Sequence, residues 1–341
     1  MPRTMTRALA VVGIGLLCLV PLLGLTDYHL HVLITILLWA FIYTGWSIMG
    51  RFGLVSLGHG AFLGIGAYGV TMLWNHFGLT PWLGIPIALA LAGAVAVVIG
   101  YPCFRFRITG HYFALVTLAL SQVVLLLIVA LRDWTGGSLG VTPRTALADS
   151  SWSFVALQFA DKKVWFYIVL AFWLGGLVIW RLVDRSMARY ALEAISQEED
   201  AAASVGINVT RTKLTVTLIS AAMTAMGGAL YGQYQMYINP ETVSGIAISL
   251  QIVFAVIAGG MFVQLGPTVG ALITLLLAES LRVAVGHEVH GLDGTIYGLM
   301  LVLFIIYMPK GVLGKLIELW QRYGAGTTPP GRLRPAPEAA E

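Results

Sequence analysis

The sequence predicts an all-α polytopic membrane protein of about ten transmembrane helices, and three observations support this class. Of the 341 residues, 58% are hydrophobic and 11% are charged, and the mean hydropathy is +0.85. Apolar windows of about 20 residues, the length needed to cross a bilayer, recur along the chain. Lys and Arg gather in alternate connections between the windows. A chain this apolar cannot bury its surface in one soluble core.

Ten apolar windows make up the expected membrane domain, residues 1–326. The windows are residues 8–25, 31–50, 54–74, 82–101, 111–131, 164–183, 212–232, 247–264, 267–285 and 294–310. Glycine interrupts the pattern around Gly53 and Gly266, so a re-entrant half-helix is an alternative there. Arg3 and Arg7 precede the first window as in a signal peptide, but that window is long and lacks a small-x-small cleavage site. It is therefore expected to stay as the first helix.

Charge placement orients the chain. With both termini in the cytosol, fifteen of the 20 Lys and Arg residues lie on the cytosolic side, whereas the 16 acidic residues divide equally. The positive-inside rule requires an asymmetry of Lys and Arg of this kind. On this map the block of the second to fifth helices begins outside, and the block of the seventh to tenth helices begins inside. That arrangement is compatible with inverted repeats, as in many transporters.

Three segments lie outside the windows. Residues 184–211 form the only substantial cytosolic loop, and residues 132–163 form the longest extracytoplasmic loop. Residues 327–341 are rich in Pro and lack apolar periodicity, so they are expected to be a disordered cytosolic tail. The basic residues form no stripe or tract, and binding to nucleic acid is therefore not expected.

The cytosolic loop has the features of a helix that touches a partner. Residues 191–203 are strong helix formers, and Gly206 suits a helix C-terminus. Glu198, Glu199 and Asp200 are expected to expose their acidic side chains. Because this amphipathic stretch stands isolated between long apolar blocks, the loop is interpreted as a contact site for a cytosolic partner. An ordinary solvated loop helix is the alternative.

Small and polar residues gather in the third window. They are Ser56, His59, Gly60, Gly64 and Tyr68. The spacing of four between Gly60 and Gly64 favours close approach of another helix over a direct lining role. His59 either lines an aqueous path or hydrogen-bonds a backbone carbonyl, and the sequence leaves both interpretations open.

Signals for an enzyme or a metal site are weak. His287 and His290 stand three residues apart. A spacing of four residues is the one that places two histidines on one helical face around zinc. No Gly-x-x-x-x-Gly-Lys-Ser/Thr phosphate loop occurs, so ATP coupling would have to come from another subunit. Cys18 and Cys103 fall at opposite depths, which predicts neither a disulfide nor a metal pair. We therefore expect no catalytic residue, cofactor or metal.

Several weak motifs stand in a fixed order through almost the whole chain. They are residues 53–68, 113–118, 135–138 and 203–208, Gly259-Gly260 with Leu265-Gly266-Pro267, and residues 309–314. Together these stretches resemble the LivM-type permease subunits of branched-chain amino acid ABC importers. The resemblance implies an importer permease fold, and it implies a pathway or helix-packing role for the small and polar residues of the third window.

The resemblance also implies a role for the cytosolic loop. Importers of this kind share the signature Glu-Ala-Ala, three residues, Gly, which the chain matches at residues 200–206 with Asp in place of Glu. The family's usual Pro beyond the Gly is absent, and Ile219 stands in its place. The residues to which ATPase coupling is thereby assigned are Arg189, Glu193, Glu198, Glu199, Asp200 and Gly206.

The implied assembly contains a second related permease subunit, two cytosolic P-loop ATPase subunits and a periplasmic substrate-binding protein, in the bacterial inner membrane. The solute stays open among branched-chain amino acids, urea, amides and aromatic acids. A self-contained secondary transporter or channel is the alternative, but it would need ionisable residues inside the membrane. Glu279 has Arg282 three residues on, a spacing that favours a local ion pair. His59 is then the one ionisable residue left convincingly within a predicted span.

Overall fold

The computed structural model describes residues 13, 15–146, 152–285, 298–299, 302–303 and 311–324. The start of the first predicted window and most of the last one therefore lie outside the described residues. The same holds for His287, His290, the side chain of Arg282 and the predicted tail at residues 327–341. All structural statements below concern the described part of the chain.

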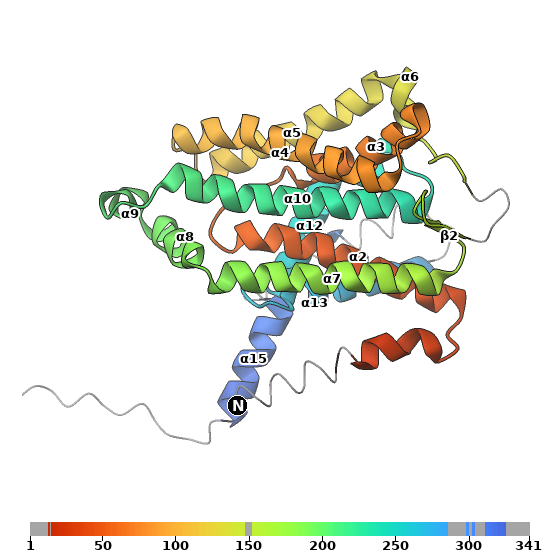
Figure 1. Ribbon diagram of the computed structural model, residues 1–341. Coiled ribbons are helices and arrows are strands. Elements are labelled where there is room, and N and C mark those ends of the chain that lie inside the picture. Colours follow the sequence, from red (N-terminus) through yellow and green to blue (C-terminus); the bar gives the residue numbers. More distant parts are fainter. Residues whose placement is uncertain are drawn as a thin grey trace, which may run out of the picture.

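Helices dominate the structure (Figure 1). They are α2 (Asp27–Gly50), α3 (His59–Phe77), α4 (Pro81–Arg105), α5 (Gly110–Ala130), α7 (Lys162–Arg185), α8 (Met187–Gln197), α9 (Glu199–Ser204), α10 (Val209–Gln235), α12 (Ile246–Gly259), α13 (Gly266–Val285) and α15 (Gly311–Gly324). The short elements are η1 (Val20–Leu22), α6 (Arg132–Thr135), η2 (Gly137–Leu139), α11 (Pro240–Val243), and the strands β1 (Trp152–Ser153) and β2 (Gln158–Phe159). The two strands pair antiparallel in the predicted outer loop and were not anticipated.

By length and composition, six helical segments within the described residues can cross a membrane. They are α2, α4, α5, α7, α10 and the stretch Pro240–Gly259 that joins α11 to α12. This fits an all-α polytopic membrane protein, while the count of about ten stays a prediction. The helix α3 has 19 residues but is not among the six. Its glycines and its polar ends make it less apolar than the others.

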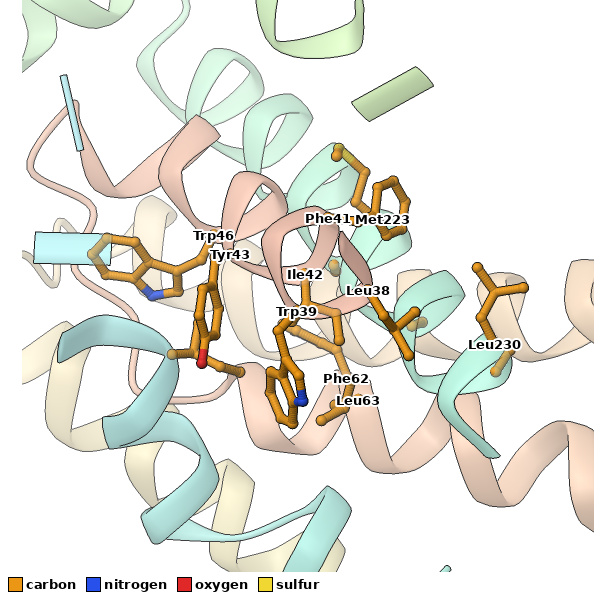
Figure 2. Packing of buried hydrophobic residues seen from close by; sticks show 14 of the residues in the cluster. Leu38, Trp39, Phe41, Ile42, Tyr43, Trp46, Phe62, Leu63, Met223 and Leu230 are labelled. Atoms are coloured by element: carbon orange, nitrogen blue, oxygen red, sulfur yellow. The ribbon is translucent and has the colours of Figure 1, made fainter. Parts of the chain in front are cut away.

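The helix α2 forms the centre of the bundle. Its apolar window is 83% buried within the chain, against 33% for the windows of α4 and α5. A helix that is apolar on all sides and buried on all sides belongs to a core, because each face has a protein neighbour. In Figure 2, Phe41 of α2 lies beside Met223 of α10, and Ile42 points toward the α3 side chains Phe62 and Leu63.

The helices α3 and α10 touch through their backbones. A Cβ atom built on Gly66 would lie 1.9 Å from the carbonyl oxygen of Ala225, and one built on Gly228 would lie 2.1 Å from that of Leu63. Without a side chain at either glycine, the two helices approach as closely as small residues permit in membrane bundles. The helix α10 also packs against α2, so it lies between α2 and α3 and joins them.

The third predicted window, residues 54–74, starts too early. The helix begins at His59, and Leu54 to Gly58 form a non-helical connection from α2. The indole Nε1 of Trp46 donates to the carbonyl oxygen of Ser56 at 2.8 Å. This bond satisfies a buried backbone acceptor that a helix would otherwise have used. The connection is therefore fixed by α2, which a hydropathy window does not represent.

Candidate functional site

The predicted coupling loop lies at one end of the bundle, where α8 and α9 project beyond α7 and α10 (Figure 1). We call this the α8–α9 end. The predicted outer loop, with α6 and β2, lies at the opposite end. The helix α8 is amphipathic and buries Leu192 and Ile195, and α9 buries Ala202. These apolar contacts hold the loop against the membrane helices.

The loop holds two helices where the propensities predicted one over residues 191–203. The break is at Glu198, whose φ of −154° and ψ of 113° are extended. The backbone N–H of Glu198 still donates to Ala194, and its carbonyl accepts from Ala202. Glu198 therefore ends α8 and starts α9. Helix propensity could not reveal the break, because the residues on both sides favour helix.

The prediction that Glu199 exposes its carboxylate is wrong. Glu199 forms an ion pair with Lys213 of α10, whose side chain is 4% exposed, while that of Glu199 is 21% exposed. A buried ammonium group needs a counter-charge, and Glu199 is turned inward to supply it. Asp200 is exposed as predicted, and its carboxylate accepts from Arg107 Nη1, just after α4, at 2.5 Å. Two neighbouring acidic residues thus link α9 to α10 and to the α4–α5 turn.

The C-terminus of α9 has the conformation expected from its glycine. Gly206 has a φ of +90°. Its N–H donates to Ala203, and the N–H of Ile207 donates to Ala202. These two bonds are those of a Schellman motif, in which the left-handed residue is nearly always Gly. The turn leads the chain into Asn208, whose side chain caps α10.

A second ionic network joins α2, α7 and α8. Arg51 Nη1 donates to Asp184 at 2.9 Å, and Arg189 lies 3.4 Å from the same carboxylate oxygen. Arg189 also pairs with Glu193 at 2.7 Å. The Arg51 side chain is 6% exposed, and its guanidinium lies 4.0 Å from the ring centre of Trp180. The predicted residues Arg189 and Glu193 thus belong to a chain of charges that reaches into the bundle.

A cavity of about 390 Å³ opens beside α9. Its walls are residues 195–200 on one side and, on the other, Phe52, Gly53 and the α4–α5 turn with Arg107 and Thr109. Glu198 is an exposed wall residue and forms no ion pair within the described chain. The cavity therefore presents a carboxylate without a counter-ion to anything that docks at this end.

His59 is fully buried at the start of α3. Its Nε2 lies 2.8 Å from the Ser220 hydroxyl, which in turn donates to the carbonyl oxygen of Gly45 at 2.7 Å. The rings of Trp46 and Phe62 meet the imidazole edge-on. His59 Nδ1 has no hydrogen-bond partner among the described residues. The imidazole thus joins α3 to α10 and α2. The sequence had left open a backbone carbonyl or an aqueous path as its neighbour, and the structure shows a hydroxyl instead.

Gly60 and Gly64 lie against the segment that starts α12. A Cβ on Gly60 would lie 2.6 Å from the carbonyl oxygen of Gly245, and one on Gly64 would lie 2.9 Å from the Cβ of Ser244. The Gly60 N–H donates to the Ser249 hydroxyl at 3.0 Å. Both glycines therefore sit where two chain segments approach too closely for a side chain.

The remaining third-window residues are also buried. The Ser56 hydroxyl accepts from the N–H of Gly58, and the Tyr68 hydroxyl donates to the carbonyl oxygen of Ile238 at 3.4 Å. Sequence reasoning missed two buried polar side chains far along the chain, Gln233 and Ser244. Neither has a hydrogen-bond partner in the described structure. Their burial was not visible in a hydropathy profile, because it depends on how distant segments pack; Ser244, for example, lies against Gly64 of α3.

At the opposite end, Glu279 of α13 accepts a hydrogen bond from the Tyr28 hydroxyl at 2.7 Å. His31 Nδ1 lies 2.6 Å from the Tyr234 hydroxyl. These bonds tie the first turns of α2 to α13 and α10. The predicted Glu279–Arg282 pair stays a prediction, since the Arg282 side chain lies outside the described residues.

Comparison with known proteins places this bundle. The family described as the permease component of branched-chain amino acid transport systems matches residues 28–307, most of the chain. The chain belongs to this family. Its members are transport permeases, which is not a class of enzyme. No solved structure matches the chain at a significant level.

Curated relatives of this permease come from bacteria and archaea. The high-affinity branched-chain amino acid transport system permease protein LivM of Escherichia coli is 31% identical over 285 residues, which cover 78% of this chain and 65% of the relative. The LivH permease protein of the same organism is 26% identical over 294 residues, or 81% of this chain and 91% of LivH. A probable LivM of Methanocaldococcus jannaschii is 23% identical over 78% of this chain and 80% of its own length. The permease thus spans about two thirds of the E. coli LivM.

Proposed function

We propose that this chain is the transmembrane permease subunit of an ATP-driven importer for branched-chain or related amino acids. The observation that carries the proposal is the attachment of α8 and α9 to four membrane helices. Ion pairs join α9 to α10 and the α4–α5 turn, and the Asp184 carboxylate of α7 binds both Arg189 of α8 and Arg51 at the end of α2. The names of the LivM and LivH relatives support the solute class. They do not favour a self-contained carrier.

The proposed mechanism transmits force from a separate ATPase. Closure of the ATPase would displace α9, and the Glu199–Lys213 and Asp200–Arg107 pairs would carry that displacement to α10 and to the α4–α5 turn. The His59–Ser220 contact and the glycine contacts of α3 would then shift α3 with α10. A switch of this kind needs two arrangements of the bundle, one favoured by nucleotide and one by the binding protein.

The proposed assembly includes a second related permease subunit, two cytosolic P-loop ATPases and a periplasmic binding protein. The chain is placed in the inner membrane with both termini in the cytosol, so that the α8–α9 end faces the ATPases. The third-window residues Ser56, His59, Gly60, Gly64 and Tyr68 would position α3 beside the solute pathway. Substrate choice would reside mainly in the binding protein.

The coupling proposal is tested by reversing the unpaired charge of Glu198. Glu198→Lys is expected to reduce copurification of the ATPase and to uncouple ATP hydrolysis from transport. The loss should grow at low ionic strength, because exposed charges are screened over about 10 Å at 0.1 M salt. Gly206→Val should have a similar effect at all salt concentrations, since a β-branched residue resists a φ of +90°. ATPase copurification and ATP hydrolysis in reconstituted membranes are the measurements.

The matched control is Glu241→Lys, the same charge reversal in α11. This helix follows the bridge between Val141 and Ile238, and therefore lies with the predicted outer loop. Glu241→Lys should leave ATPase binding unchanged. Full coupling in both Glu198→Lys and Gly206→Val would remove the proposed role of α9, and transport by the wild-type chain without an ATPase would favour the secondary transporter.

The orientation is tested by labelling single cysteines. In a chain whose Cys18 and Cys103 are replaced by Ala, a cysteine at the exposed position Ser196 should react only from the cytosolic side. One at the exposed position Ser138, at the opposite end, should react only from outside. A membrane-impermeant maleimide applied to intact cells and to inverted vesicles distinguishes the two. Labelling of both positions from one side would contradict the proposed topology.

A further inference from the structure

A furrow runs along the surface between α7 and α10. It consists of two adjoining cavities of about 450 and 540 Å³. The first is lined by Phe172 and Gly175 of α7 and by Met226 of α10, and Phe41 of α2 lies at its floor. The second continues one turn further along both helices and ends at Arg211 in the first turn of α10. Its wall at this end also includes Met187, Ala188, Ala191 and Leu192 of α8. The furrow exists because α7 and α10 both pack on α2 but scarcely touch each other.

The length of the furrow corresponds to one leaflet of a bilayer. Along α7 it extends from Ala171 to Ser186, which is about 22 Å at the rise of an α-helix. Half of a bilayer, including its headgroup region, is about 20–22 Å thick. Ala171 lies nine residues into the 24-residue helix, so the inner end of the furrow is near mid-membrane.

The chemistry of the furrow changes along its length. The cavity near mid-membrane is lined only by apolar side chains and glycine, and the cavity at the α8–α9 end adds Ser186, Thr212, Thr215 and Arg211. Arg211 is exposed and forms no ion pair within the described residues. At the same end, Arg51, Arg107, Arg189 and Lys213 each hold a carboxylate. Arg105, Arg181 and Arg185 are also exposed without an ion pair among the described residues, but they do not line the furrow.

We propose that this furrow binds one anionic phospholipid of the leaflet at the α8–α9 end, with an acyl chain between α7 and α10 and the phosphate at Arg211. An apolar channel that ends at an unpaired cation at headgroup depth complements an acidic phospholipid. The first turn of α10 adds the positive end of the helix dipole. A helix from another subunit would instead need a partner for the Arg211 charge inside the interface.

The structure supplies variants that fill the furrow without disturbing the fold. A Cβ built on Gly175 meets no atom within 4 Å, so Gly175→Leu would project into the furrow. Arg211→Gln removes the charge and keeps the backbone bond from Arg211 N to the Asn208 cap. The controls are Val178→Phe, an exposed position of α7 outside the furrow, and Arg185→Gln, an exposed arginine at the same end.

The experiment is native mass spectrometry of the full chain, delipidated in detergent and titrated with phosphatidylglycerol or phosphatidylcholine. The wild type should bind one phosphatidylglycerol molecule more tightly than any further lipid molecules that attach to it. Arg211→Gln should weaken that binding about fivefold and remove the preference over phosphatidylcholine, since one basic residue near an anionic headgroup contributes about that factor. Gly175→Leu should abolish the tight site for both lipids. The two controls should behave as wild type.

Equal phosphatidylglycerol binding in Gly175→Leu and Val178→Phe would overturn the proposal. So would an unchanged preference in Arg211→Gln. If Gly175→Leu keeps the lipid but loses copurification with a second permease subunit, the furrow is a subunit interface and the lipid site is wrong. None of these three results depends on ATPase coupling, so the test is separate from that of the proposed function.

Discussion

Glu199→Ala is expected to be the most damaging single change in the α8–α9 region. It leaves the ammonium group of Lys213, 4% exposed, without its counter-charge. Breaking a buried pair from one side typically costs about 3–5 kcal/mol, because the remaining charge stays desolvated. We expect a lower thermal unfolding midpoint for the purified chain and loss of ATPase coupling. Unfolding followed by tryptophan fluorescence and by size-exclusion chromatography measures the effect.

Two further variants identify the cause. Asp200→Ala removes the neighbouring ion pair with Arg107. The Arg107 and Asp200 side chains are 63% and 69% exposed, so the loss should cost at most about 1 kcal/mol of stability. Adding Lys213→Met to Glu199→Ala should restore most of the lost stability, since replacing both members of a buried pair by apolar groups is often neutral. Equal stability of the Glu199→Ala and Asp200→Ala chains would show that the Lys213 site admits water.

Gly66→Ala is expected to disrupt the contact between α3 and α10. The new methyl group would lie 1.9 Å from the carbonyl oxygen of Ala225, and a backbone atom cannot move out of the way alone. The two helices would have to separate, which reduces their packing along their whole length. Overpacking of this kind costs about 3 kcal/mol. We expect a large fall in the yield of monodisperse protein and in its thermal stability.

The control for this variant is Gly93→Ala in α4. Its methyl group would meet only Leu218 Cδ2, at 3.7 Å, an ordinary contact. Because Ala favours helix over Gly by about 1 kcal/mol, Gly93→Ala should be neutral or stabilising. Gly228→Ala should resemble Gly66→Ala, since it meets the Leu63 carbonyl from the other helix. If the Gly66→Ala and Gly228→Ala chains were both as stable as the wild type, α3 and α10 would have to be further apart than in the structure.

The position of the loop at residues 184–211 was predictable, and its internal geometry was only partly so. Residues 184–211 stand out by polarity alone, and the left-handed Gly206 follows from local sequence, because helices commonly end in a left-handed glycine. The inward turn of Glu199 did not follow. Its partner Lys213 lies fourteen residues on, beyond the turn at Gly206, and only the packing of α9 on α10 brings the two together. The pair Arg51–Asp184 joins residues still further apart in the chain.

The candidate pathway residues show the same division. The spacing of Gly60 and Gly64 predicted a close approach, but the sequence could not say that the neighbour is the segment at Ser244 and Gly245. Buried polar side chains such as Gln233 were not predicted at all. Whether a buried side chain finds a hydrogen-bond partner depends on how two helices or segments pack together. Local sequence describes only one of the two.

The sequence by itself determined that the chain is an all-α membrane protein, where its polar loops lie and which family it resembles, because hydropathy and local conformation are properties of contiguous residues. Only the tertiary structure decided that α2 is the core while α4 and α5 stay largely exposed. All three are apolar throughout. Lipid tails are as apolar as leucine, so a side chain suited to lipid is equally suited to a protein neighbour. Which one it meets is settled by the close contacts of glycines and by buried ion pairs between distant helices.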